Sequence, residues 1–137
     1  MIDILEMAEY DYVVDAIDSL SPKVFFIYYL LKQNLLLVFS LWVGGLFVPT
    51  QVQVADIKKT YQCRLAHAIR KRLHKMGVDS GFKAVFSPEP TVRESVVIDA
   101  DPTVNKLSTT GTISYLPAVF GCVAASVVIR DLLEGFC

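Results

Sequence analysis

Cysteine and histidine are scarce in this chain, which has 137 residues with three cysteines and two histidines. Cys63, Cys122 and Cys137 form no pair with CxxC spacing, and a four-ligand structural zinc site has little to draw on. An odd number of thiols is typical of an intracellular protein that keeps its cysteines reduced. The sequence therefore predicts neither a disulfide framework nor a structural zinc centre.

Charge of one sign is also lacking, because 13 Lys and Arg stand against 14 Asp and Glu, for a formal net charge of −1. Any nucleic-acid binding would have to come from a local patch, and no DNA partner is expected. The opening residues, 1–10, carry acidic side chains where a secretion signal carries positive charge. We therefore expect a cytoplasmic protein.

Apolar residues, in contrast, are abundant at 53% of the chain, which favours one α/β domain with a sheet covered on both faces. Ser21 and Pro22 resemble an N-cap followed by the first residue of a helix. The pattern predicts helices over 24–33, 65–76 and 111–133, the last one buried. It predicts strands over 10–17, 35–42, 51–57, 82–87 and, more weakly, 95–98, with 51–57 antiparallel or at an edge. A mixed sheet follows from this order.

Residues 24–48 leave a second interpretation open, because about 20 apolar residues can span a bilayer. Lys32, Gln33 and Asn34 would then lie near the centre of the membrane, where a lysine costs roughly 2.5 to 3.5 kcal/mol. This polar triplet is more typical of a turn between a helix and a strand. A single-span membrane protein is the less favoured alternative.

Asp15 and Asp18 lie at the carboxyl end of the first predicted strand, where open α/β sheets bind their ligands. Carboxylates hold magnesium well when phosphates supply the remaining ligands. Aspartates also end strands and form turns for purely local reasons, so the pair alone does not decide between the two roles.

One basic cluster occurs along the helix predicted over 65–76. Its apolar face consists of Leu65, Ile69, Leu73 and Met76. The remaining positions include Arg64, His67, Arg70, Lys71, His74 and Lys75. Such a helix is either solvated on its outer face or a phosphate-contacting surface for RNA, for which Arg64, Arg70, Lys71 and Lys75 are the candidate residues.

Four segments, in this order, carry a resemblance to a known family: YDYVVDAIDSLSPK, VPTQVQVADIKKT, VDSGFKAVFSPEP and GTISYLPAVFGCVAASVVIRDLL. The first resembles the DxxDN-type segment of the ubiquitin-activating-enzyme-like proteins ThiF, MoeB and HesA. All four resemble the TcdA/CsdL branch, the tRNA threonylcarbamoyladenosine dehydratases. They cover nearly the whole chain.

The resemblance implies an α/β fold, the C-terminal half of a doubly wound, ThiF-like mixed sheet with flanking helices. Residues 1–137 would form part of an adenylating domain that uses ATP and magnesium to activate a carboxylate on tRNA before cyclisation. Asp18 matches the family's magnesium- and ATP-holding aspartate, and Asp15 and Ser19 would support it.

Two departures from the family accompany this resemblance. The glycine-rich phosphate loop GxGGVGS does not occur in these residues, and Leu41 and Trp42 stand where the family has glycines. The nucleotide-binding half would then come from elsewhere, through pairing with another chain. The resemblance also implies that the chain can form a homodimer. The alternative function is a non-catalytic interaction module that binds tRNA or a full-length relative.

Overall fold

The computed structural model describes residues 9–91, 96–98 and 108–134, with the backbone alone for 96–98 and 108–110. Residues 1–9 have a helix-like spacing of apolar side chains but are too short to predict a helix of their own, and all but the last of them lie outside the described range. The helices are α2 (Leu20–Lys32), α3 (Arg64–Lys75) and α4 (Tyr115–Leu133), with short 3₁₀ turns η1 (Pro49–Gln51) and η2 (Ile57–Lys59). The strands are β1 (Val13–Asp15), β2 (Leu37–Ser40), β3 (Gln53–Asp56), β4 (Lys83–Phe86), β5 (Val96–Ile98) and β6 (Ser108–Thr110).

Four strands form a mixed sheet in the order β1-β2-β4-β3. β1 runs parallel to β2, with Val14 opposite Val38, and β2 runs parallel to β4. β3 pairs antiparallel with β4 and forms an edge, as its polar and apolar alternation predicts. β5 and β6 form a separate antiparallel pair. The mixed α/β architecture is therefore confirmed, and β6 is a strand that the sequence pattern did not reveal.

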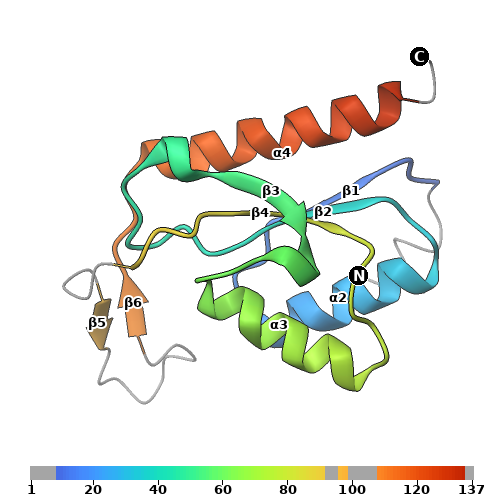
Figure 1. The fold of residues 1–137 in the computed structure, drawn as a ribbon, viewed down its shortest axis with the longest axis horizontal. Coiled ribbons are helices and arrows are strands. Elements are labelled where there is room, and N and C mark those ends of the chain that lie inside the picture. Colours follow the sequence, from blue (N-terminus) through green and yellow to red (C-terminus); the bar gives the residue numbers. More distant parts are fainter. Residues whose placement is uncertain (1–8, 92–95, 99–107, 135–137) are drawn as a thin grey trace.

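Helices cover both faces of the sheet, with α2 and α3 on one side and α4 on the other (Figure 1). In β2, Phe39 faces the cluster under α2 and α3, whereas Val38 faces the cluster under α4. Successive residues of a strand point to opposite faces, so both must be apolar when both faces are covered. This explains why β2 appears in the sequence as an uninterrupted apolar run.

α2 begins earlier than its sequence pattern suggests. Its N-cap is Ser19, not Ser21, and Pro22 is the third helical residue rather than the first. The helix ends as predicted, because Asn34 takes a left-handed conformation with φ of 56° just past the C-cap. Residues 24–48 are thus divided between α2, a turn and β2, and they do not form one membrane-length helix.

α4 is less buried than predicted. Leu116, Phe120, Ala124 and Val127 pack on the sheet, but the opposite face is exposed, including Ile129. Within the described part of the chain, α4 is also the one helix long and apolar enough to span a membrane, a property that core helices of soluble proteins share. The prediction of a buried helix therefore holds for one face only, because small residues such as Ala125 and Ser126 on the outer face made that face look like part of a core.

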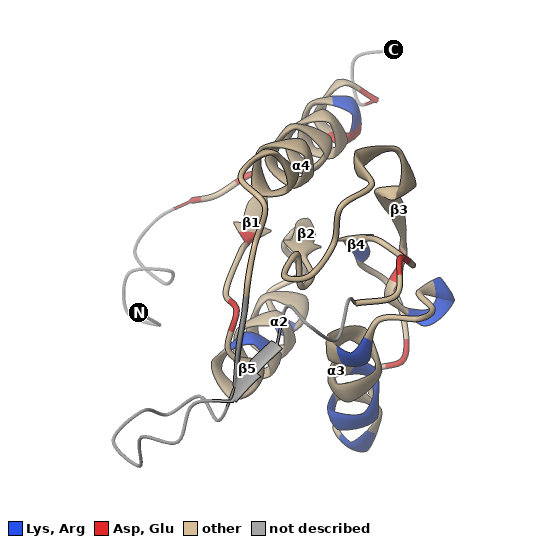
Figure 2. Cartoon of the chain, turned by 90° about the vertical axis from the view of Figure 1, so that its left-hand side faces the viewer, with Lys and Arg blue, Asp and Glu red and all other residues tan. Residues whose placement is uncertain are grey.

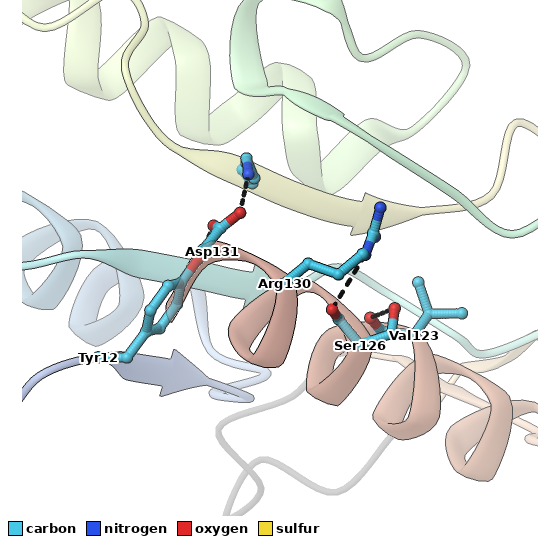
Figure 3. Close-up of polar contacts among 6 residues, drawn as sticks. Tyr12, Val123, Ser126, Arg130 and Asp131 are labelled. Atoms are coloured by element: carbon cyan, nitrogen blue, oxygen red, sulfur yellow. Dashed lines mark hydrogen bonds and ion pairs between the residues drawn. The ribbon is translucent and has the colours of Figure 1, made fainter. Parts of the chain in front are cut away.

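A polar contact fixes the carboxyl-terminal end of α4 to the sheet (Figure 3). The Tyr12 hydroxyl donates to Asp131 Oδ2 at 2.8 Å, and Lys83 forms an ion pair with Asp131 Oδ1. Tyr12 precedes β1 and Lys83 begins β4, so one carboxylate joins two strands to the helix. Burial, together with the hydrogen bond to Asp131, raises the pKa of Tyr12 above its ordinary value.

This contact predicts a pH-dependent stability. Burial favours the neutral form of Asp131, but hydrogen bonds from Lys83 and Tyr12 outweigh it and lower its pKa. The contact therefore stabilises the fold above the ordinary aspartate pKa, and the stabilisation is lost as pH falls through the lowered value. In urea unfolding at pH 7, we expect Asp131→Asn to cost about 1–3 kcal/mol. The difference from wild type should shrink in acid, and an unchanged difference would contradict this role.

Candidate functional site

A tight turn follows β1 and carries the predicted aspartates. Asp15 is buried, and its Oδ1 accepts a hydrogen bond from the Ile17 amide at 2.7 Å. Its Oδ2 lies 3.1 Å from Nζ of Lys23, which also donates to the Ile17 carbonyl at 2.9 Å. Asp15 and Lys23 therefore hold both sides of the turn between the strand and α2.

Lys23 is fully buried, with 0% of its surface exposed, which is rare for a lysine. Its ammonium lies 5.3 Å from the centre of the Phe39 ring. Burial lowers the pKa of Lys23, and the charge of Asp15 opposes this shift. Lys23 was not among the residues predicted for the site, although it is a single cation between Pro22 and the apolar residues 24–31.

Asp18 has a different position from Asp15. It is exposed, accepts a hydrogen bond from the Ser19 hydroxyl at 3.2 Å, and lines a cavity of about 400 Å³. Asp15 does not line this cavity, and Ser19 contacts it only through Asp18. The structure thus separates the predicted residues into one carboxylate at the cavity and one buried carboxylate behind it.

The cavity lies where β1 and β2 end and α4 begins, so it combines strand ends with a helix start. Its lining is mainly apolar and comprises Val14, Ala16, Ile17, Asp18, Ser40, Leu41, Trp42, Val43, Gly44, Leu65, Thr112, Pro117, Phe120, Gly121 and Ala124. Leu41 and Trp42 both form part of this wall. An apolar cavity with few polar groups is typical of a site for a flat organic group.

Two contacts fix the loop that follows β2 and closes one side of the cavity. Glu89, which is nearly buried, accepts hydrogen bonds from the amides of Phe47 and Val48 at 2.9 Å. The Gly45 amide donates to the carbonyl of Gly111 at 2.8 Å. These contacts hold the loop in one conformation.

The lining of this cavity offers one carboxylate, that of Asp18, as a ligand for a magnesium ion. Among the described residues, no group of three or more His, Cys, Asp or Glu side chains could hold a metal. One carboxylate with phosphate oxygens is nevertheless the usual protein contribution to a nucleotide-bound magnesium. The donor set therefore fits a metal that arrives with its phosphates and does not fit a metal held by protein alone.

The basic residues gather on α3 and on the neighbouring η2 (Figure 2). Arg64, Lys71 and Lys75 are exposed. Arg70 is turned toward η2, where its guanidinium donates to the Thr60 carbonyl at 2.9 Å. Of the four cations predicted to contact RNA, Arg70 therefore has a structural contact as well.

The sequence of this chain is similar to those of known proteins. No family model matches the chain. The dehydratases from Bacillus subtilis, Escherichia coli and Haemophilus influenzae are 31%, 34% and 33% identical to it, over 90%, 90% and 91% of its length. All three are tRNA threonylcarbamoyladenosine dehydratases. The chain is a homologue of these ThiF-like dehydratases.

Solved structures agree with this dehydratase relationship. The Escherichia coli dehydratase in complex with ATP superposes with a TM-score of 0.81 at 33% identity and covers 98% of the chain. The same enzyme in complex with AMP gives a TM-score of 0.79. The chain spans about half the length of the curated relatives it matches, 51% and 52% for the first two.

Proposed function

We propose that this chain forms the metal-facing wall of the nucleotide site in an ATP-dependent tRNA threonylcarbamoyladenosine dehydratase. The observation that carries the proposal is Asp18, which lies at the edge of an apolar cavity of about 400 Å³ at the ends of two parallel strands. A homologue with the same fold has been solved with ATP bound. Open α/β sheets bind ligands at this end of their strands.

The reaction has two steps in this proposal. The substrate carboxylate attacks the α-phosphorus of ATP and releases pyrophosphate, and an internal nucleophile of the same modified adenosine then closes the ring and releases AMP. Asp18 would hold magnesium on the phosphates, and the metal would neutralise the charge that develops as pyrophosphate leaves. The apolar wall, including Trp42 and Phe120, would exclude water that could hydrolyse the acyl-adenylate.

Asp15 and Lys23 act behind this wall in a supporting role. Their ion pair fixes the turn that carries Asp18, because Asp15 holds the Ile17 amide and Lys23 holds the Ile17 carbonyl. A carboxylate held in one place loses little conformational freedom when it binds a ligand. The Ser19 hydroxyl, which donates to Asp18, adds a further constraint.

The phosphate cradle must come from residues outside these 137. No glycine-rich loop occurs in the sequence to provide backbone amides to a pyrophosphate group. A separate chain that carries the nucleotide-binding half would complete the site. The proposal therefore predicts activity only when such a half is supplied.

Pyrophosphate exchange tests this proposal. The chain alone should not exchange labelled pyrophosphate into ATP in the presence of threonylcarbamoyladenosine-modified tRNA. Adding the nucleotide-binding half of the Bacillus subtilis relative should restore exchange, and Asp18→Asn should abolish it. Asp11→Asn, an exposed carboxylate before β1, is the matched control. Exchange that survives Asp18→Asn would refute the assignment.

The alternative is a non-catalytic module that binds tRNA. The observation that favours it is the exposed basic surface of α3, which is independent of the nucleotide site. In that case the chain would bind tRNA without ATP and would show no exchange with any added half.

A further inference from the structure

Charge is strongly segregated along this chain. Residues 57–78 contain seven of its 13 Lys and Arg and none of its 14 Asp and Glu. Figure 2 shows these cations over η2 and α3, away from α4. A surface of this kind attracts a polyanion although the molecule as a whole is almost neutral.

Five of these seven cations are exposed, and among the described residues their side chains form no hydrogen bond or ion pair. Arg70 bonds to Thr60, and Arg72 donates to the hydroxyl of Ser21 at 2.7 Å. The exposed cations, here called the basic surface, are Lys58, Lys59, Arg64, Lys71 and Lys75. The contact of Arg70 with Thr60 ties η2 to α3, so the two parts of the basic surface keep a fixed relative position.

An exposed tyrosine lies in the same segment of the chain as these cations. Tyr61 is 48% exposed and lies two residues after the end of η2, between Lys59 and Arg64 in the sequence. Its ring contacts the buried Phe86 edge to face, with centroids 5.6 Å apart, and its hydroxyl lies 3.3 Å from the side-chain amide of Gln53. The ring is therefore held in place, while the edge-to-face contact leaves at least one of its faces open.

We propose that the basic surface binds RNA and that Tyr61 stacks on an unpaired base. Phosphates on either side of that base would contact Lys58, Lys59 and Arg64. Aromatic side chains among cations are how proteins bind single-stranded nucleic acid, whereas a duplex keeps its bases stacked inside and offers none to Tyr61. The partner is thus an RNA with unpaired nucleotides. This inference rests on the proposed function in one respect, which is the choice of tRNA as that RNA.

The position of α3 connects this surface to the cavity. Leu65, the residue after Arg64, lines the same cavity as Asp18. An RNA strand with one base stacked on Tyr61 and a phosphate in contact with Arg64 would therefore pass the edge of the cavity. A nucleotide next to the stacked base would then lie near this cavity, while the rest of the RNA stays on α3.

Fluorescence anisotropy without ATP tests the inference, with three labelled probes: tRNA, a short unstructured RNA, and a blunt RNA duplex with the same number of phosphates. Tyr61→Leu keeps apolar bulk against Phe86 but removes the aromatic face. It should weaken binding to tRNA and to the unstructured RNA about tenfold and leave the duplex unchanged. Tyr61→Phe should restore wild-type affinity.

Two control variants separate stacking from charge. Tyr10→Leu removes a tyrosine of similar exposure, 39%, outside the basic surface, and should change nothing. Lys59→Ala should weaken all probes and reduce the salt slope by about 0.7 to 0.9. Equal effects of Tyr61→Leu on duplex and unstructured RNA, or no effect on either, would overturn the inference. Because no ATP is present, a failure of adenylation leaves this result unaffected.

Discussion

Replacing Lys23 with methionine is expected to destabilise the fold by about 3–5 kcal/mol, the cost of leaving one charge of a buried pair without its partner. Asp15 is 1% exposed and lies 3.1 Å from the lysine ammonium, so its carboxylate would keep a buried charge. The Ile17 carbonyl would lose a donor as well. Urea unfolding followed by circular dichroism measures the difference.

The matched control is Lys32→Met on the same helix. Lys32 is exposed and contacts only the Tyr28 ring among the interactions described, at 5.3 Å, so its loss should cost about 1 kcal/mol or less. The double variant Asp15→Asn with Lys23→Met should recover part of the lost stability, because it removes both charges. A Lys23→Met variant as stable as Lys32→Met would show that the pair does not hold the turn.

The elements with strong periodicity could be predicted from the sequence. α3 alternates apolar and basic residues at helical spacing, and β3 alternates polar and apolar residues, so each reveals its buried face directly. β2 and α4 are apolar nearly throughout. Such runs indicate that an element is buried, but they do not show which of its faces is buried. This is why the exposed outer face of α4 was not anticipated.

The site was only partly predictable for a related reason. Asp15 and Asp18 lie close together in the sequence, at the end of a strand. Only the fold shows that Asp15 is buried in an ion pair with Lys23, whereas Asp18 lies at the cavity. The buried ion pair depends on a side chain one helical turn inside α2. Likewise, the sequence pattern around Tyr61 does not distinguish it, and only the structure shows that its ring is exposed while it rests on Phe86.

The assignment of Asp18 as a metal ligand makes the second large prediction. Removing the single carboxylate that reaches the nucleotide's metal should weaken binding of the metal–ATP complex by tenfold or more, about 1.4 kcal/mol for each factor of ten. Without a phosphate cradle, we expect the wild-type chain to bind this complex weakly, near millimolar affinity, or about −4 kcal/mol. The method must therefore detect weak binding and identify the residues that lie next to the bound metal.

Manganese–ATP supplies that method, because manganese is paramagnetic and accepts the same oxygen ligands as magnesium. In amide NMR spectra of the chain, the complex should broaden the signals of Ile17, Asp18 and Trp42 first. Excess magnesium–ATP should reverse the broadening. Asp18→Asn should abolish it, while Asp11→Asn should leave it intact. Broadening that is absent from these residues, or that persists in Asp18→Asn, would contradict the claim that this chain presents Asp18 to the metal of a bound nucleotide.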